Sequence, residues 1–102
     1  MIINEISERK ISVTCDDGTE MALRTTPQLG HIAFPSELSH HAKRRIASAV
    51  ISHWRKASQK TLKRITPSTS RTLRKRYSQK HRHQQNIANA FLDTYSRYWL
   101  GP

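Results

Sequence analysis

The first quarter of the chain alternates apolar and polar residues, the pattern of a β-strand that buries one face. Ile11 and Val13 alternate with polar residues, and the turn-forming residues Asp16-Asp17-Gly18 follow them. A three-residue loop would pair Ile11 with Leu23 on one apolar face, whereas a two-residue loop would pair Ile11 with Arg24. Because the buried face normally sets strand register, the sequence predicts the three-residue loop. The same register pairs Cys15 with Thr19 and Val13 with Met21.

The segments on either side of this hairpin are expected to support it, because an isolated hairpin is only marginally stable in water. Upstream, three isoleucines can form a third strand or pack beneath the hairpin: Ile2, Ile3 and Ile6. Downstream, residues 26–35 contain two prolines and a glycine, which is typical of a linker. We expect three apolar side chains to anchor this linker to the core: Leu29, Ile32 and Phe34.

A first amphipathic helix is predicted over residues 36–64. Ser36 precedes Glu37, and a serine N-cap followed by an acid in the first turn is a common helix start. Apolar residues then recur at spacings of three and four, the period of a helix with one buried face. They are Leu38, Ala42, Ile46, Ala49, Val50, Trp54 and Ala57.

A second helix is predicted over residues 70–99, after a short break rich in serine and threonine. Thr66 could cap a helix that begins with Pro67, and Ser68 or Ser70 could provide the cap equally well. Its apolar stripe, interrupted by one glutamine, consists of Leu73, Tyr77, Gln84, Ile87, Phe91, Tyr95 and Tyr98.

Together these patterns predict a single domain over residues 1–102, of the α+β class and mostly α. A β-hairpin region at residues 1–25 and the linker precede a basic hairpin of two helices. The length of 102 residues fits one compact domain. The hydrophobic fraction is 35%, below the ~45–50% usual for globular chains, so we expect a small core.

Composition excludes several classes of protein. No apolar run approaches the ~18 residues that a membrane span needs, and the N-terminus lacks the apolar segment of a signal peptide. The single cysteine, Cys15, excludes an intrachain disulfide and a cysteine-only zinc site. We therefore expect a cytoplasmic protein without a membrane partner.

The charge is unevenly distributed along the chain, and its overall value is +11. Residues 1–37 hold six acids and three bases, whereas residues 38–92 hold fourteen Lys and Arg and no acid. Such a segment cannot neutralise itself, so we expect a polyanionic partner. No base-reading motif accompanies the charge, which favours a protein that handles nucleic acid over nucleic acid itself. The candidate binding residues are Lys43, Arg44, Arg45, Arg55, Lys56, Lys60, Lys63, Arg64, Arg71, Arg74, Lys75, Arg76, Lys80 and Arg82.

The histidines and acids do not form a recognisable metal or cofactor site. His40-His41 are adjacent and His81-x-His83 are two apart, whereas ligands on one helix face are three or four apart. Asp16-Asp17 and Glu20 could suggest a nuclease triad, but Ala22 stands where a restriction-type nuclease has lysine. We therefore expect no metal, no cofactor and no catalytic acid pair.

One motif on the second helix resembles an enzyme signature. Arg76 and His81 have the Arg-x4-His spacing of the HEPN ribonucleases, which are also helical bundles. The resemblance implies that both are catalytic, with His81 handling the proton of the ribose hydroxyl. The chain departs from that family at Tyr77, where the family favours a small polar or acidic residue. A small HEPN-like ribonuclease toxin is therefore an alternative to the non-enzymatic protein that we expect.

The aromatic residues are expected to divide between core and surface. We expect Trp54, Phe91 and Tyr95 to pack in the core. Tyr98 and Trp99 exceed what a small core needs so close to a terminus, so they are candidates for a protein-docking patch.

Pro67 follows Thr66 in a polar loop between the two helices. Bonds of this kind populate the cis form and exchange slowly, so Pro67 is a candidate site for a host prolyl isomerase. A trans proline at the start of a helix is the favoured alternative.

The whole chain resembles the small anti-RecBCD proteins of lambdoid phages, the Abc type. The resemblance combines the acidic hairpin Lys10–Leu23, the acid-free stretch His40–His83 and the aromatic tail Tyr95–Leu100. It implies a non-enzymatic protein that binds the RecC subunit of host RecBCD and alters that exonuclease and helicase, which protects phage DNA ends and favours phage recombination. The alternatives are direct, non-specific DNA or RNA binding and the ribonuclease toxin above.

Overall fold

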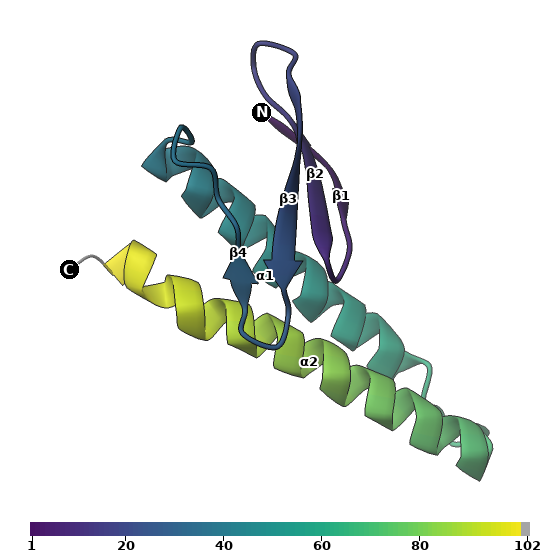
Figure 1. Ribbon diagram of the computed structural model, residues 1–102. Helices are drawn as coiled ribbons and strands as arrows, with labels where there is room; N and C mark the ends of the chain where they lie inside the picture. The colour runs from purple at the N-terminus through teal and green to yellow at the C-terminus, as the bar shows by residue number, and fades with distance from the viewer. Residues whose placement is uncertain (101–102) are drawn as a thin grey trace.

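The computed structural model describes the backbone of residues 1–100 and the side chains of residues 1–96. Within this range it confirms the α+β class: an antiparallel four-stranded sheet, in the order β1-β2-β3-β4, precedes two long helices (Figure 1). The molecule is elongated, with extents of 50 × 32 × 17 Å. The elements are β1 (Ile2–Ile6), β2 (Lys10–Thr14), β3 (Glu20–Thr26), β4 (His31–Ile32), α1 (His40–Lys63) and α2 (Arg71–Leu100).

The hairpin of β2 and β3 has the predicted register. Ile11 pairs with Leu23, and the backbone N–H of Cys15 donates to the carbonyl of Thr19 at 2.8 Å across the three-residue loop. Gly18 has a φ of +87°, which glycine adopts without the steric cost of a side chain. The buried face therefore determined the pairing, as the sequence pattern indicated.

The segments that flank the hairpin are both strands. The first is β1, which pairs with β2, and its Ile3 and Ile6 pack against the core. The second is β4, whose Ile32 pairs with Thr25, so two residues of the segment expected as a linker over 26–35 form a short strand. The tight turn after Thr26 brings the chain back beside β3, where a two-residue strand completes the sheet edge.

The three predicted anchors of the linker have different environments. Ile32 is fully buried and Phe34 is partly buried against the core, as expected. Leu29, however, is 70% exposed. It lies in the turn between β3 and β4, where its backbone carbonyl, and not its side chain, contacts α2 by accepting a hydrogen bond from Thr94 Oγ1 at 3.0 Å.

Both helices begin slightly later than the sequence pattern indicates. Ser39, not Ser36, caps α1, and its hydroxyl accepts a hydrogen bond from the backbone N–H of Ala42 at 3.1 Å. A turn closed by Leu38 N–H and the carbonyl of Pro35 occupies the earlier site. Ser70, one of three candidate caps, accepts from the N–H of the third α2 residue at 3.3 Å.

The core lies where the sheet covers the two helices (Figure 1). Trp54, Phe91 and Tyr95 are buried in it, as predicted. Leu73 belongs to the predicted stripe but is 41% exposed, because it lies near the loop between the helices, away from the apolar cluster. The buried apolar residues are Ile11, Val13, Leu23, Ile32, Ile46, Ala47, Val50, Ile51, Trp54, Ile87, Ala88, Phe91 and Tyr95.

Candidate polyanion-binding surface

The loop-proximal parts of α1 and α2 extend past the sheet as a two-helix projection, which we call the basic arm (residues 58–84; Figure 1). Nine of the fourteen candidate binding residues lie on it, and all nine are exposed. They are Lys60, Lys63, Arg64, Arg71, Arg74, Lys75, Arg76, Lys80 and Arg82. The arm carries no acid, so its charge is of one sign over its whole length.

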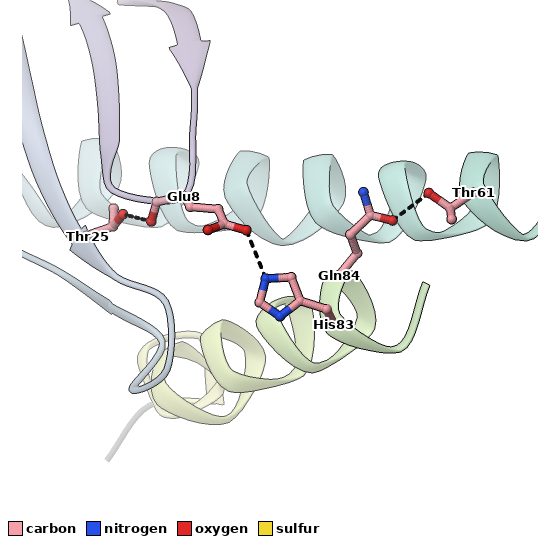
Figure 2. Close-up of polar contacts among 5 residues, drawn as sticks. All are labelled: Glu8, Thr25, Thr61, His83 and Gln84. Atoms are coloured by element: carbon pink, nitrogen blue, oxygen red, sulfur yellow. Dashed lines mark hydrogen bonds and ion pairs between the residues drawn. The ribbon is translucent and has the colours of Figure 1, made fainter. Parts of the chain in front are cut away.

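The interior of the basic arm is polar. Thr61 Oγ1 donates to Gln84 Oε1 at 2.6 Å between the two helices, and both residues are buried (Figure 2). One turn away, His81 Nδ1 lies 2.8 Å from the carbonyl oxygen of Ser58. Among the described residues, no buried side-chain nitrogen or oxygen lacks a hydrogen-bond partner. The arm is therefore held together by specific hydrogen bonds more than by a large apolar contact.

The turn between β1 and β2 contacts the base of the arm. Glu8 Oε1 lies 2.9 Å from His83 Nε2, and the backbone carbonyl of Glu8 accepts a hydrogen bond from Thr25 Oγ1 (Figure 2). Both ionisable side chains are about half exposed, so this pair contributes little to stability. Its effect is local, because it places the sheet against α2 at the arm's boundary.

The bases of the arm are not neutralised within the described part of the chain. The ion pairs among its side chains join Glu8 to His83 and the N-terminal ammonium to Asp16, and neither uses lysine or arginine. Cations at a helix N-terminus also oppose the helix dipole, yet Arg71 and Arg74 occupy the first turns of α2. This arrangement does not stabilise the helices, so it is better suited to binding an external anion.

The remaining five bases lie on α1 outside the arm. They are Lys43, Arg44, Arg45, Arg55 and Lys56. Arg45 lies near the tip of the β2–β3 hairpin, where a hydrogen bond from the N-terminal ammonium, with a smaller contribution from Arg45, lowers the pKa of Asp16 below its ordinary value. The fourteen predicted residues therefore form two surfaces in the structure.

The candidate ribonuclease pair lies on the arm. Arg76 is exposed, whereas His81 is partly buried and hydrogen-bonded to the backbone of α1. Five residues of helix correspond to a rotation of about 140° between the two side chains. Arg76 and His81 therefore lie on one helix, but their side chains project from it in different directions.

The acids have structural roles at the hairpin tip. Asp17 Oδ1 accepts a hydrogen bond from the N–H of Thr19 at 2.9 Å, which lowers the pKa of Asp17 below its ordinary value. Asp16 binds the N-terminus. In the described residues, no group of three or more His, Cys, Asp and Glu is placed to hold a metal ion.

The two other predicted sites are Pro67 and the aromatic pair Tyr98 and Trp99. Pro67 is exposed in the loop at the end of the arm, and its peptide bond is trans. The expectation that Pro67 begins the second helix is wrong, because α2 begins at Arg71. Tyr98 and Trp99 lie outside the residues whose side chains the structure describes.

Sequence reasoning missed two exposed leucines on the arm. Leu62 is 50% exposed and Leu73 is 41% exposed, and each lies within one helical turn of the connecting loop. Leu62 falls outside the apolar stripe of α1, which was the available signal that it faces solvent. Two exposed apolar side chains therefore lie near the end of an otherwise basic arm.

In the described part of the chain, neither helix combines the length and the apolarity needed to cross a membrane. Comparison with protein-family models, with curated proteins and with solved structures finds no match for this chain.

Proposed function

We propose that this protein is a non-enzymatic modulator that binds a host nucleic-acid-processing complex through its basic arm. The specific target would be the RecC subunit of host RecBCD, whose exonuclease and helicase activities it alters to protect phage DNA ends. One observation carries the proposal: the arm extends past the sheet and carries bases with no acid, and it ends in the exposed side chains of Leu62 and Leu73.

This combination fits a protein surface better than free nucleic acid. Complementary charge steers a partner and accelerates association, but affinity usually comes from a few desolvated anchors. Leu62 and Leu73 can provide such anchors, because their side chains are large, apolar and exposed. Nucleic acid would use the bases of the arm but would leave these leucines without an apolar contact.

The test measures binding of the purified protein to purified RecBCD and its effect on the degradation of linear duplex DNA. We expect Leu62→Gln with Leu73→Gln to weaken binding at least tenfold and to restore DNA degradation. The control is Leu29→Gln, which removes an even more exposed leucine from the β3–β4 turn and should change neither quantity. Absence of binding by the unaltered protein would refute the proposal.

Three further measurements separate the remaining hypotheses. If the arm itself bound nucleic acid, a duplex or a single strand would bind tightly without RecBCD, with affinity that falls steeply as salt rises, and replacing bases of the arm would abolish that binding. A ribonuclease would lose its activity in His81→Ala, whereas a modulator would degrade no RNA in either form. A prolyl isomerase acting at Pro67 would make the effect on RecBCD isomerase-dependent, and Pro67→Ala would abolish that dependence.

A further inference from the structure

Two shallow grooves lie along the part of α1 that precedes the basic arm. The first has a volume of about 780 Å³ and separates α1 from Ile3 of β1. The second has a volume of about 360 Å³ and separates α1 from Leu92 of α2. Ser48 and Ser52 line both grooves, so the grooves lie on either side of one continuous surface of α1.

We call this surface the α1 strip and define it as Arg44, Arg45, Ser48, Ser52, Arg55 and Lys56, all of which are exposed and line one or both grooves. At 100° per residue these six side chains occupy a sector of about 120° around the helix. At 1.5 Å per residue the two pairs of bases are roughly 16 Å apart, with the two hydroxyls between them.

The chemistry of the strip is that of a phosphate-binding surface. Arginine, lysine and serine side chains supply most protein contacts to the DNA backbone. No carboxylate lines either groove, whereas Glu20 and Glu8 each line another groove of the molecule. Arg45 acts electrostatically on Asp16, but the carboxylate of Asp16 already binds the N-terminal ammonium.

We propose that the α1 strip binds the sugar-phosphate backbone of double-stranded DNA without reading its sequence. A protein partner is disfavoured, because interfaces between proteins need apolar anchors and the exposed large apolar residues of the described chain lie elsewhere. These are Ile2, Leu29, Leu62 and Leu73. The spacing of the two pairs of bases is comparable with the ~12 Å width of the major groove, so each pair can contact phosphates on one side of that groove.

A single strand is a poorer occupant than a duplex. Proteins that hold single strands combine positive charge with exposed aromatic rings on which bases stack. The large ring within the span of the strip, Trp54, is only 8% exposed and belongs to the core, and the exposed imidazole of His53 packs edge-on against it. The strip therefore offers charge and hydroxyl groups to a backbone but no large exposed ring for unstacked bases.

This inference does not rest on the proposed function, because the strip and the basic arm share no residue. The two surfaces are nevertheless compatible. The arm would bind the DNA-processing complex, and the strip would hold the backbone of the duplex that enters the complex. DNA binding by the strip and RecBCD binding by the arm can be measured independently, because the DNA-binding experiment contains no RecBCD.

The test measures the affinity of the full chain for a fluorescent duplex over a range of salt concentrations. The duplex has about 20 base pairs, which is about two helical turns. The strip variant is Arg44→Gln, Arg55→Gln and Lys56→Gln. The control variant, Arg9→Gln, Arg24→Gln and Lys10→Gln, removes two arginines and one lysine from exposed positions of the sheet and its β1–β2 turn, outside both the strip and the arm. Both variants therefore have the same net charge, and circular dichroism verifies that each is folded.

We expect the strip variant to lose at least tenfold in affinity at low salt. Its slope of log K against log salt should decrease by up to about 0.9 for each phosphate contact removed. The control variant should stay within about threefold of the unaltered protein in affinity. If the strip variant fails to fold, Arg55→Gln with Lys56→Gln, compared with Arg9→Gln with Lys10→Gln, provides the same contrast.

Four results would overturn the proposal. The first is that the unaltered protein does not bind the duplex at low salt. The second is equal loss in both variants, which would indicate binding through overall charge alone. The third is tighter binding of a single strand of the same length. The fourth is equally effective displacement of the duplex by poly-glutamate, which would make the strip a surface for acidic protein.

Discussion

The phenol oxygen of Tyr95 lies 2.6 Å from the backbone nitrogen of Ile32, which is 63 residues earlier in the chain. The phenol accepts that N–H and lies 3.3 Å from the carbonyl oxygen of the same residue, to which it can donate. Its ring also packs edge-on against Phe34, at 5.8 Å between centroids. One side chain of α2 thus satisfies the backbone of β4 and attaches the edge of the sheet to the helices.

Tyr95→Phe should destabilise the fold by about 1–3 kcal/mol, because it leaves the buried N–H of Ile32 without a partner while it preserves the ring. Urea denaturation measures the change. Tyr77→Phe, at a partly buried position on the basic arm, is the control and should cost less than half as much. Equal losses in the two variants would show that the hydrogen bond to Ile32 is not important for stability.

Gly30→Ala should be severely destabilising, whereas Gly18→Ala should be mild. A Cβ at Gly30 would lie 2.1 Å from the backbone carbonyl carbon and oxygen of Ala90, so the β3–β4 turn could not stay against α2. A Cβ at Gly18 meets no atom within 4 Å. Both glycines have positive φ, which alone costs alanine about 1–2 kcal/mol.

The measurement for this pair is thermal unfolding. Gly18→Ala should lower the melting temperature only modestly, because its cost is the backbone strain of about 1–2 kcal/mol. Gly30→Ala should lower the melting temperature much further or prevent folding. A similar decrease in both variants would mean that the close approach of Gly30 to Ala90 is not needed for the fold.

The buried pair Thr61 and Gln84 should show strong coupling in a double-mutant cycle. Thr61→Val alone leaves the buried amide oxygen of Gln84 without its partner, at a cost of about 1–3 kcal/mol. Gln84→Leu alone should cost less, because the Thr61 hydroxyl can still donate to the carbonyl oxygen of Ala57 at 3.0 Å. The double variant replaces both polar groups with apolar ones, so its cost should be well below the sum of the single costs. Additive losses in urea denaturation would refute the coupling.

Asp17 should make stability depend on pH in the acid range. The hydrogen bond from the N–H of Thr19 lowers the pKa of Asp17 below 3.8 in the folded state. The stabilisation is therefore complete above the unfolded-state pKa and is lost as the pH falls through the folded-state pKa. Asp17→Asn keeps the acceptor oxygen but does not titrate.

We therefore expect the free energy of unfolding of the unaltered protein to fall more than that of Asp17→Asn between about pH 5 and pH 2. The difference should be small, because Asp17 is fully exposed. An NMR titration of the Asp17 carboxyl measures the pKa directly, and a value at or above 3.8 would contradict the expectation.

Local patterns were sufficient wherever the nearest neighbours in sequence decide the structure. The register of β2 and β3 followed from the apolar face that includes Ile11 and Leu23, and both helices lie close to their predicted ranges. The first residue of α1 was harder to predict from the sequence. Ser36 and Ser39 are both good caps, and only the turn at Pro35 determines which of them is used.

The α+β class, the hairpin register and the acid-free run of charge follow from the amino-acid pattern alone, because each depends on periodicity or composition. The place of Ile32 in the sheet depends on the three-dimensional fold, since β4 needs Tyr95, far away in the chain, to satisfy its backbone. The fold also sets how the bases divide. Nine lie on an arm with a polar interior and five lie on α1 beside the grooves, because the sheet covers only part of the two helices.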